Sequence, residues 1–436
     1  MYKVFFITFG CKVNQYETES LKTSFQKNGF EISGSPDGAD VIVINSCTVT
    51  EYGDNDVIAT LRKMRKKYPS AVIVMTGCYP QANAQNLEKL SGADIVTGTK
   101  NRKDTLRLVC EYLEDRERRI SVEKYVTGDK FETLDFPAFE NNTRTFMKIQ
   151  DGCNQFCTYC IIPYARGRCR SRTLESVRTE AENSVKTGKK EIVLTGINLA
   201  FYGMEHGTNL ADAVEICSAV DGVKRIRLGS LEPEKMSDDL LKRLSAVPVL
   251  CRQFHLSLQS GCDRTLKAMN RHYTTAEYYK LVRKIRKYFP DCSFTTDIMV
   301  GFPGETDEDF RESMDFVEKI GFSRVHVFRY SRRQGTPAYS MSGQIPEHIK
   351  TARAVEMNGI AEKSRKKYMD SLIGKTVEVL FERENCTDFH RGYATDYTLI
   401  KIPLENSEKS LRNQIFYVTI EESHTDFCTG RIEYEK

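Results

Sequence analysis

The chain has 436 residues, of which 40% are hydrophobic and 28% charged, and its formal net charge is +4. This length predicts two to four domains, and the composition is that of an ordinary globular protein. Because the sequence has no apolar run of about 18 residues and its first ten residues do not resemble a secretory leader, we expect a cytoplasmic protein without a membrane partner. The fourteen cysteines are then expected to serve metals or catalysis rather than disulfides.

Residues 1–115 alternate between apolar strand-like runs and helical patterns. The runs lie at 4–9, 41–44, 71–75 and 94–96, and the helical patterns lie at 17–28, 55–68 and 81–90. Short β-rich runs between helices are typical of a parallel sheet covered by helices on both faces. We therefore expect an amino-terminal α/β domain of βαβ units over residues 1–115.

Each of the first three strand-like runs ends at a cysteine. These are Cys11, Cys47 and Cys78, which are 36 and 31 residues apart. Because ligands bind at the carboxyl ends of strands in such sheets, the fold would gather the three thiols at one edge. A lone cysteine is more often a small buried apolar residue, but three in the same structural position favour a metal cluster. We predict that they hold one.

Residues 116–142 are charged and have little periodicity, so we predict a solvated linker there. A second domain is predicted over residues 143–372, where six strand-like runs are mostly separated by amphipathic helices and the last helix spans 347–372. The strand-like runs lie at 146–150, 191–195, 225–228, 253–258, 293–300 and 324–329. Six βα repeats predict an incomplete parallel barrel with its active site at the carboxyl ends of the strands.

Three cysteines lie within ten residues after the first barrel strand, in the segment DGCNQFCTYC. Cys153, Cys157 and Cys160 have the spacing C-x3-C-x2-C. Three thiolates this close can bind a [4Fe–4S] cube and leave one iron open to a small molecule. A zinc site or three structural thiols are the alternatives, but structural zinc sites usually have two C-x2-C pairs. The sequence therefore predicts an iron–sulfur cluster with one open iron.

Polar loops that contain glycine follow four of the other barrel strands. They lie at 195–198, 229–233, 257–261 and 301–305. Glycine lets the backbone approach a ligand closely, but it also serves simply to turn the chain. The sequence leaves both roles open for each loop.

Residues 373–436 show only strand patterns, at 377–381, 391–402, 415–419 and 428–433. About 60 residues of short strands predict a small five-stranded barrel of the OB type, a shape often used to bind nucleic acid. Aromatic side chains at Phe389, Tyr393, Tyr397, Phe416 and Tyr417 could stack on bases, but core packing accounts better for most of them.

With both cysteine sets placed, the sequence resembles the methylthiotransferase family of radical S-adenosylmethionine (SAM) enzymes from end to end. The segments Phe9–Gln15, Asn45–Val49 and Thr76–Tyr79 resemble the motifs of the family's auxiliary cluster. The segment Cys153–Cys160, with Tyr159 before the last cysteine, resembles the SAM motif. Residues 373–436 resemble the family's carboxy-terminal RNA-binding TRAM domain. The fold expected is thus α/β, with a parallel-sheet domain, a partial (β/α)6 barrel and a small all-β domain.

The resemblance implies two [4Fe–4S] clusters with different tasks. The cluster on Cys153, Cys157 and Cys160 would bind and cleave SAM to a 5′-deoxyadenosyl radical, and the auxiliary cluster would keep one iron free for the transferred sulfur. Two equivalents of SAM are implied, one as methyl donor and one as radical source. The predicted contacts to SAM are Tyr159, Gly196, Asn198, Ser257 and Gln259.

The substrate implied is a tRNA base, because the segments Cys11–Tyr16 and His326–Ser331 resemble the branch of the family that modifies threonylcarbamoyladenosine. Methylthiolation would occur at carbon 2 of this adenosine, beside the anticodon. The threonylcarbamoyl group carries a carboxylate, so its pocket should offer a cation, and Arg329, Arg332 and Arg333 lie where the last barrel strand ends.

Other functions stay open at this stage. The same chemistry could act on isopentenyladenosine in tRNA or on an aspartate of a ribosomal protein. A non-catalytic iron–sulfur protein that binds RNA or carries electrons is less favoured, because an electron carrier gains nothing from a missing fourth ligand. The partners expected are the tRNA anticodon loop, a one-electron reductant such as flavodoxin or ferredoxin, and a sulfur donor.

Overall fold

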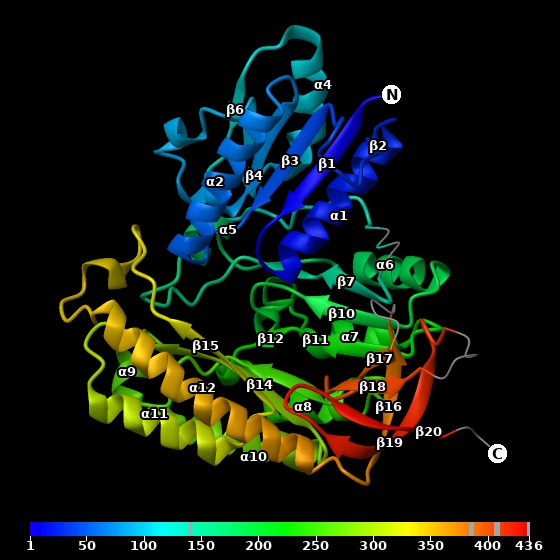
Figure 1. The fold of residues 1–436 in the computed structure, drawn as a ribbon, viewed down its shortest axis with the longest axis vertical. Coiled ribbons are helices and arrows are strands. Elements are labelled where there is room, and N and C mark those ends of the chain that lie inside the picture. The colour runs from blue at the N-terminus through cyan, green and yellow to red at the C-terminus, as the bar shows by residue number, and fades with distance from the viewer. Residues whose placement is uncertain (138, 140–141, 383–387, 405–409, 434–436) are drawn as a thin grey trace.

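The computed structural model describes residues 1–137, 139, 142–382, 388–404 and 410–433. Parts of the linker predicted at 116–142 and of the domain predicted at 373–436 therefore lie outside the described residues. Figure 1 shows an amino-terminal α/β unit above a central layer of strands and helices, with the red carboxy-terminal strands beside that layer. Within the described ranges, every helix is too short or too polar to cross a lipid bilayer.

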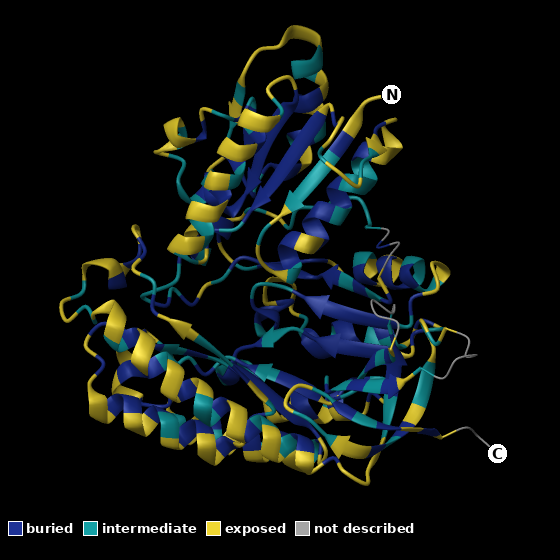
Figure 2. Ribbon diagram, in the orientation of Figure 1, coloured by how far each residue is buried: buried dark blue, intermediate teal, exposed yellow. Residues whose placement is uncertain are grey.

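The amino-terminal unit is a six-stranded parallel sheet of order β2-β1-β3-β4-β5-β6. Its two faces bury different residues, since Ile42 and Ile44 join one apolar core while Val41 and Val43 join another. Figure 2 shows the central strands buried under exposed helix faces, as the continuous apolar runs predict. The elements are β1 (Lys3–Thr8), α1 (Lys12–Lys27), β2 (Glu31–Ile32), β3 (Val41–Ser46), α2 (Glu51–Lys67), β4 (Val72–Gly77), α3 (Cys78–Ala82), η1 (Leu87–Leu90), β5 (Ile95–Thr97), η2 (Arg102–Asp104), α4 (Thr105–Asp115) and β6 (Arg119–Ser121).

Two details of this unit differ from the sequence prediction. The helix predicted at 81–90 is two short pieces, α3 and η1, and the sheet extends past residue 115 because β6 pairs with β5 in parallel. The strand β6 was missed because its three residues, Arg119 to Ser121, are mostly polar and follow a run of charges. The sheet therefore includes residues 119–121, which the sequence prediction assigns to the linker.

The central domain is the predicted partial barrel, with parallel strands in two neighbouring sheets of order β11-β10-β7 and β12-β13-β14-β15. The strands β7 and β15 are the two free edges, so the barrel is open at its side, and α1 packs against β7 there (Figure 1). The strands are β7 (Arg144–Lys148), β10 (Glu191–Thr195), β11 (Arg225–Leu228), β12 (Ser230–Leu231), β13 (Gln253–Leu256), β14 (Ser293–Val300) and β15 (Arg324–Arg329), with β8 (Gln150–Asp151) and β9 (Arg170–Ser171) as a separate pair.

Amphipathic helices cover the outside of this barrel, and most begin at a side-chain cap. Thr274 and Thr306 each form a capping box with the acidic residue three positions later, which fixes the starts of α10 and α11. The helices are α5 (Ile162–Arg166), α6 (Leu174–Lys186), α7 (Leu210–Ser218), α8 (Asp238–Ser245), α9 (Asp263–Ala268), α10 (Thr275–Tyr288), α11 (Asp307–Ile320) and α12 (Glu347–Asp370), with short turns η3 (Leu199–Phe201), η4 (Met204–His206), η5 (Pro233–Lys235) and η6 (Pro337–Ser340).

The carboxy-terminal strands close into the predicted five-stranded barrel, in the order β16-β17-β18-β20-β19. The single strand predicted at 391–402 is a hairpin, which turns at Thr395–Thr398. No glycine or proline marks this turn; instead the Asp396 carboxylate accepts hydrogen bonds from the Thr398 backbone and hydroxyl, and Tyr397 takes a left-handed backbone with φ of 72°. The strands are β16 (Thr376–Phe381), β17 (Phe389–Ala394), β18 (Leu399–Pro403), β19 (Ile415–Ser423) and β20 (Cys428–Glu433).

This hairpin closes the amino-terminal end of the central barrel. Arg225 and Arg227, at the start of β11, donate hydrogen bonds to the backbone carbonyls of Tyr393, Ala394 and Thr395. Buried carbonyls at a turn need such donors, so the contact fixes the small barrel against the large one. The opposite, carboxyl ends of the strands are left for the cysteine motifs.

Candidate iron–sulfur sites and the buried charges between them

The three amino-terminal cysteines follow three neighbouring strands that end at the same level. The register pairs Thr8 with Asn45 and Asn45 with Thr76, so the turns after β1, β3 and β4 lie side by side. Gly10 has φ of +98°, and a Cβ there would lie 2.8 Å from the Cys47 Sγ, so only glycine allows this approach. The structure thus brings Cys11, Cys47 and Cys78 together, as the strand-end pattern predicts.

The charge state of these thiols reflects burial and a nearby cation. Burial raises the pKa of Cys78 to about 12, the guanidinium of Arg166 opposes that rise, and the Cys47 and Cys11 thiols add to it. Burial likewise raises the pKa of Cys47. A metal centre that binds these thiols must therefore displace their protons.

Asn14 holds the two loops of this site and was not singled out from the sequence. Its amide donates to the carbonyl of Phe9 at 2.8 Å and to that of Ser46 at 2.9 Å, which are the residues near Cys11 and next to Cys47. Its spacing of three from Cys11, on the first turn of α1, was the only available signal. The side chain therefore sets the distance between the first two thiols.

The second set of cysteines lies in the loop between β8 and α5. The Cys160 backbone donates to the Cys157 carbonyl at 2.9 Å. Burial raises the pKa of Cys153 and of Cys160, and the nearby Cys157 thiol adds to both shifts. Two side-chain donors face the sulfurs: Arg271 lies 3.3 Å from the Cys157 Sγ, and the Asn198 amide lies 3.9 Å from the Cys153 Sγ.

This donor set fits an iron–sulfur cluster better than a single metal ion. Within the described ranges, no three His, Cys, Asp or Glu side chains are close enough to hold one ion. A cube places each cysteine on a different iron, so its ligands lie farther apart, and N–H groups directed at sulfur are typical of the protein around it. Arg271 is itself fixed, since it pairs with the buried Glu232 carboxylate. Its position in a loop after α9 gave no signal in the sequence.

The five residues predicted to contact SAM lie around this loop. Tyr159 packs edge-on against Phe302, and Ser257 and Gln259 are partly exposed where β13 ends. The Asn198 Oδ1 is buried without a hydrogen-bond partner in the described part of the chain, which leaves an acceptor for a ligand. At position 196 close packing requires glycine, because a Cβ there would lie 2.9 Å from the Gln150 side chain.

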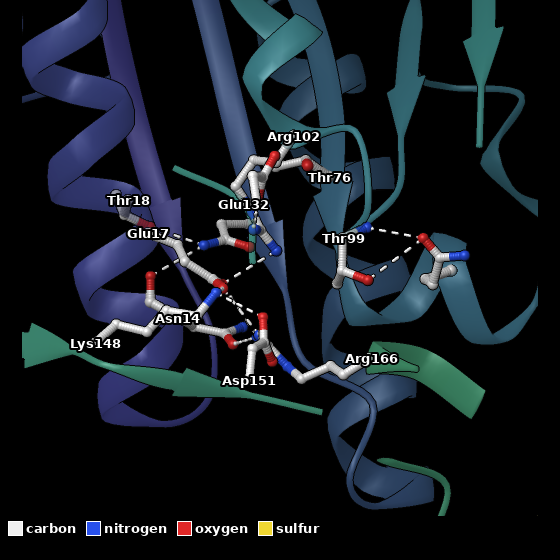
Figure 3. Close-up of polar contacts among 12 residues, drawn as sticks. Asn14, Glu17, Thr18, Thr76, Thr99, Arg102, Glu132, Lys148, Asp151 and Arg166 are labelled. Atoms are coloured by element: carbon white, nitrogen blue, oxygen red, sulfur yellow. Dashed lines mark hydrogen bonds and ion pairs between the residues drawn. The ribbon is translucent and has the colours of Figure 1, made fainter. Parts of the chain in front are cut away.

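A cluster of buried charges joins α1 of the amino-terminal domain to β7 and α5 of the central domain (Figure 3). Its centre is Glu17 of α1, which is fully buried and pairs with Lys148 at 2.7 Å, Arg166 at 2.8 Å and Arg102 at 3.1 Å. Asp151, two residues before Cys153, pairs with Lys148 at 2.6 Å and Arg166 at 3.2 Å. We call these five residues the interdomain charge cluster.

Arg166 links the cluster to both cysteine sites. It follows the SAM motif in sequence, and its guanidinium donates to the Asn14 Oδ1 at 2.7 Å, beside the auxiliary site. Its buried Nε has no hydrogen-bond partner among the described residues. A buried N–H normally has a partner, so this donor fits the sulfur of a bound cluster near Cys78. One guanidinium thus contacts the groups that shape both sites.

Glu17 is expected to contribute strongly to stability. Glu17→Gln leaves buried cations with one carboxylate fewer, so the free energy of unfolding should fall by about 3–5 kcal/mol, measured by denaturant titration of the full chain at pH 7. Glu19→Gln, on the same helix and partly exposed beside Lys22, is the matched control and should cost under about 1 kcal/mol.

The same residue gives this effect a pH dependence. Burial alone would raise the pKa of Glu17, but Arg102, Arg166 and Lys148 lower it from 4.5 to about 2. A depressed carboxyl pKa stabilises the fold above the unfolded value and loses that contribution as the pH falls from about 4.5 toward 2. The difference between wild type and Glu17→Gln should therefore shrink over this range, and a constant difference would contradict the assignment.

The three predicted substrate arginines already have protein partners. Arg333 is buried and pairs with Asp54 at 2.8 Å and with the hydroxyl of Thr48. Arg329 donates to Thr351 at 2.9 Å, and Arg332 donates to the carbonyl of Tyr339 at 2.9 Å. Because Thr48 follows Cys47, the clearest role of Arg333 is to hold the loop after β15 against the auxiliary site.

The sequence is similar to two family models and to many curated proteins. A model described as the radical SAM superfamily matches residues 147–317, and one described as the uncharacterized protein family UPF0004 matches residues 3–98. The protein named Threonylcarbamoyladenosine tRNA methylthiotransferase MtaB from Aquifex aeolicus is 39% identical over 88% of this chain and 93% of its own, and the Bacillus subtilis protein of that name is 38% identical over 94% and 91%. A tRNA-2-methylthio-N(6)-dimethylallyladenosine synthase from Pelotomaculum thermopropionicum is 34% identical over 100% and 98%.

Among solved structures, the fold is similar to that of the radical SAM methyltransferase TsrM from Kitasatospora setae, which was determined with cobalamin and a [4Fe–4S] cluster bound. The TM-score is 0.58 at 16% identity, over 78% of this chain and 77% of that one. At this identity the match concerns the fold alone.

Proposed function

Because the chain belongs to the methylthiotransferase family of radical SAM enzymes, we propose that it attaches a methylthio group to carbon 2 of threonylcarbamoyladenosine beside the anticodon of tRNA. The observation that carries this proposal is the pair of cysteine triads, one after the parallel strands β1, β3 and β4 and one in the loop between β8 and α5, together with the buried charges that join their two domains. An electron carrier or a plain RNA-binding protein needs neither the second triad nor a missing fourth ligand.

Each triad would hold one [4Fe–4S] cluster, with Cys153, Cys157 and Cys160 at the first and Cys11, Cys47 and Cys78 at the second. When bound, the first cluster supplies the electron that cleaves SAM, and the resulting radical chemistry can replace the unactivated hydrogen at carbon 2. The chain's own groups prepare the site: Arg271 donates to Cys157, and the free Asn198 Oδ1 is suited to an ammonium group such as that of SAM.

The proposed RNA partner is the anticodon loop of tRNA, whose base must leave its stack to reach the barrel. The small carboxy-terminal barrel would act as a TRAM-type RNA-binding domain. A one-electron reductant of the flavodoxin or ferredoxin class, a sulfur donor and a cytoplasmic location complete the proposal.

Isopentenyladenosine in tRNA is the second candidate substrate, because relatives named for that product match the full chain. The two candidates differ in charge, since threonylcarbamoyl carries a carboxylate and isopentenyl is apolar. A pocket with a spare cation therefore favours the first.

A competition assay tests the choice. Reconstituted enzyme should be given equal amounts of tRNA that carries threonylcarbamoyl-, isopentenyl- or unmodified adenosine, with SAM and a reductant, and the methylthio nucleosides should be measured by mass spectrometry. We expect turnover of the threonylcarbamoyl form to exceed that of the others by at least about tenfold, since a site that pairs a charged group rejects an analogue without it. Equal turnover of the isopentenyl form would refute the substrate.

A further inference from the structure

Lys12, the residue after Cys11, reaches from the amino-terminal domain into the open side of the barrel. As the first residue of α1, it lies where that helix packs against the free edge of β7. Its Nζ lies 5.9 Å from the centre of the Phe146 ring in β7 and 5.7 Å from that of Tyr397 in the carboxy-terminal hairpin. One side chain therefore meets all three domains.

Among the residues that the structure describes, no carboxylate forms an ion pair with the ammonium group of Lys12. In the part of the chain that the structure describes, its recorded contacts are the two aromatic rings, and no carboxylate lies within 4.0 Å. By contrast, the buried cations Lys148 and Arg102 each have a carboxylate partner. A partly buried ammonium without a counter-ion is costly unless a ligand supplies one.

The neighbouring charges do not supply the missing partner either. Arg144 and Arg227 lie over the Tyr397 ring that Lys12 also contacts, and together with Arg225 they share the carboxylates of Glu191, Glu378 and Glu382. Those three carboxylates are therefore paired with guanidiniums, and none of them forms an ion pair with Lys12.

The position of Lys12 relative to the auxiliary site fits the proposed base. Consecutive Cα atoms are about 3.8 Å apart, so the amine of Lys12 lies one side-chain length from the cysteine before it. In the modified adenosine, carbon 2 and the carbon whose amino nitrogen bears the threonylcarbamoyl group belong to the same six-membered ring. If carbon 2 of the base lies at the auxiliary site, the carboxylate of its threonylcarbamoyl group therefore lies away from that site by about the length of the substituent.

We propose that Lys12 binds the carboxylate of the threonylcarbamoyl group and so selects this substrate over isopentenyladenosine. The inference rests on the proposed function and deepens it. The rings of Phe146 and Tyr397 flank the ammonium and hold it between β7 and the carboxy-terminal hairpin. Arg329, Arg332 and Arg333 are the competing assignment, but each already has a protein partner.

The test compares one charge on the protein with one on the RNA. Anticodon stem-loops with threonylcarbamoyladenosine, its neutral methyl ester or isopentenyladenosine are titrated onto the reconstituted full chain, and Kd is measured by fluorescence anisotropy. The proteins are wild type, Lys12→Met, Lys12→Arg and Arg332→Met, with Lys22→Met on the same helix as the matched control. Iron content and melting temperature verify that every variant is folded and loaded.

We expect wild type and Lys22→Met to bind the acid about 10- to 100-fold more tightly than the ester, the range of a hydrogen bond between charged groups. Lys12→Met should lose this preference without weaker binding of the ester, and Lys12→Arg should keep most of it. Lys12→Met could fail to load iron. In that case the test of the Lys12 assignment uses Lys12→Arg, together with the ratio of acid to ester affinity in wild type and in Arg332→Met.

Three results would overturn the assignment: no preference for the acid in wild type, an unchanged preference in Lys12→Met, or its loss in Arg332→Met instead. Failure of the proposed function looks different, because wild type would then bind or convert the isopentenyl stem-loop in preference to both others.

Discussion

Replacing Cys153, Cys157 and Cys160 together with alanine should abolish the cleavage of SAM to 5′-deoxyadenosine and halve the bound iron, from roughly eight to roughly four atoms per chain. The reason is that these thiols are the proposed ligands of one of two separate clusters. The measurements are iron and sulfide content after anaerobic reconstitution, and chromatography of the nucleoside product in the presence of dithionite.

Cys169 is a demanding control for this variant. It lies beside the same site, where its thiol accepts a hydrogen bond from the Gln150 amide at 3.1 Å and its pKa, raised to about 12 mainly by burial, also responds to Cys153. Cys169→Ala should keep about eight irons and full formation of 5′-deoxyadenosine. Loss of iron in Cys169→Ala would mean a cluster with four protein ligands, which leaves no open iron, and product from the triple variant would show that SAM is cleaved elsewhere.

Much of this site was predictable because parallel βαβ sheets follow a general rule that brings residues distant in sequence close together in space. Parallel strands in a βαβ sheet end at one edge, so three cysteines at strand ends must meet there. The SAM motif needed no fold at all, since its three cysteines are close in sequence. The α/β class, the partial barrel and the five-stranded barrel also followed from the strand patterns and are confirmed.

The residues that sequence reasoning missed depend on contacts between domains. Glu17 and Arg166 are 149 positions apart, and each alone reads as an ordinary charged residue on a helix. Lys12 looks like a solvated residue at the start of a helix until the edge of β7 and the tip of the hairpin are placed beside it. The hairpin that closes the barrel was also missed, because its turn has no glycine and is formed by Asp396 and by Tyr397 with a left-handed backbone.

The interdomain charge cluster suggests why both triads occur in one rigid chain. Arg166 is one side chain away from Asn14 at the auxiliary site and from Asp151 at the SAM motif. A buried ion pair keeps its geometry because loss of one partner leaves an uncompensated charge. The two sites are thus held at a fixed separation, as a reaction needs when a radical made at one site must act on a base held at the other.

The other large effect is expected from the auxiliary triad. Replacing Cys11, Cys47 and Cys78 with alanine should leave 5′-deoxyadenosine formation within about threefold of wild type while methylthio nucleoside falls below about 1%. The physical reason is that SAM would bind at the loop between β8 and α5, whereas the three replaced thiols belong to a different sheet. Nucleosides from digested tRNA and 5′-deoxyadenosine are quantified in the same reactions, so both readouts share one enzyme sample.

Two comparisons make this result specific. Cys110, exposed on α4 of the same domain, gives the control Cys110→Ala, which should make wild-type amounts of both products. The second is structural: Cys78 begins α3, which packs against α5, so the triple variant must first show an unchanged melting temperature of the iron-free protein. If the variant is folded and still transfers the methylthio group, the three thiols only pack the sheet edge, and the sulfur must be supplied from another site. If SAM cleavage stops as well, the two sites are not separable. Loss of the auxiliary thiols would then disturb the SAM site through the charged residues around Arg166.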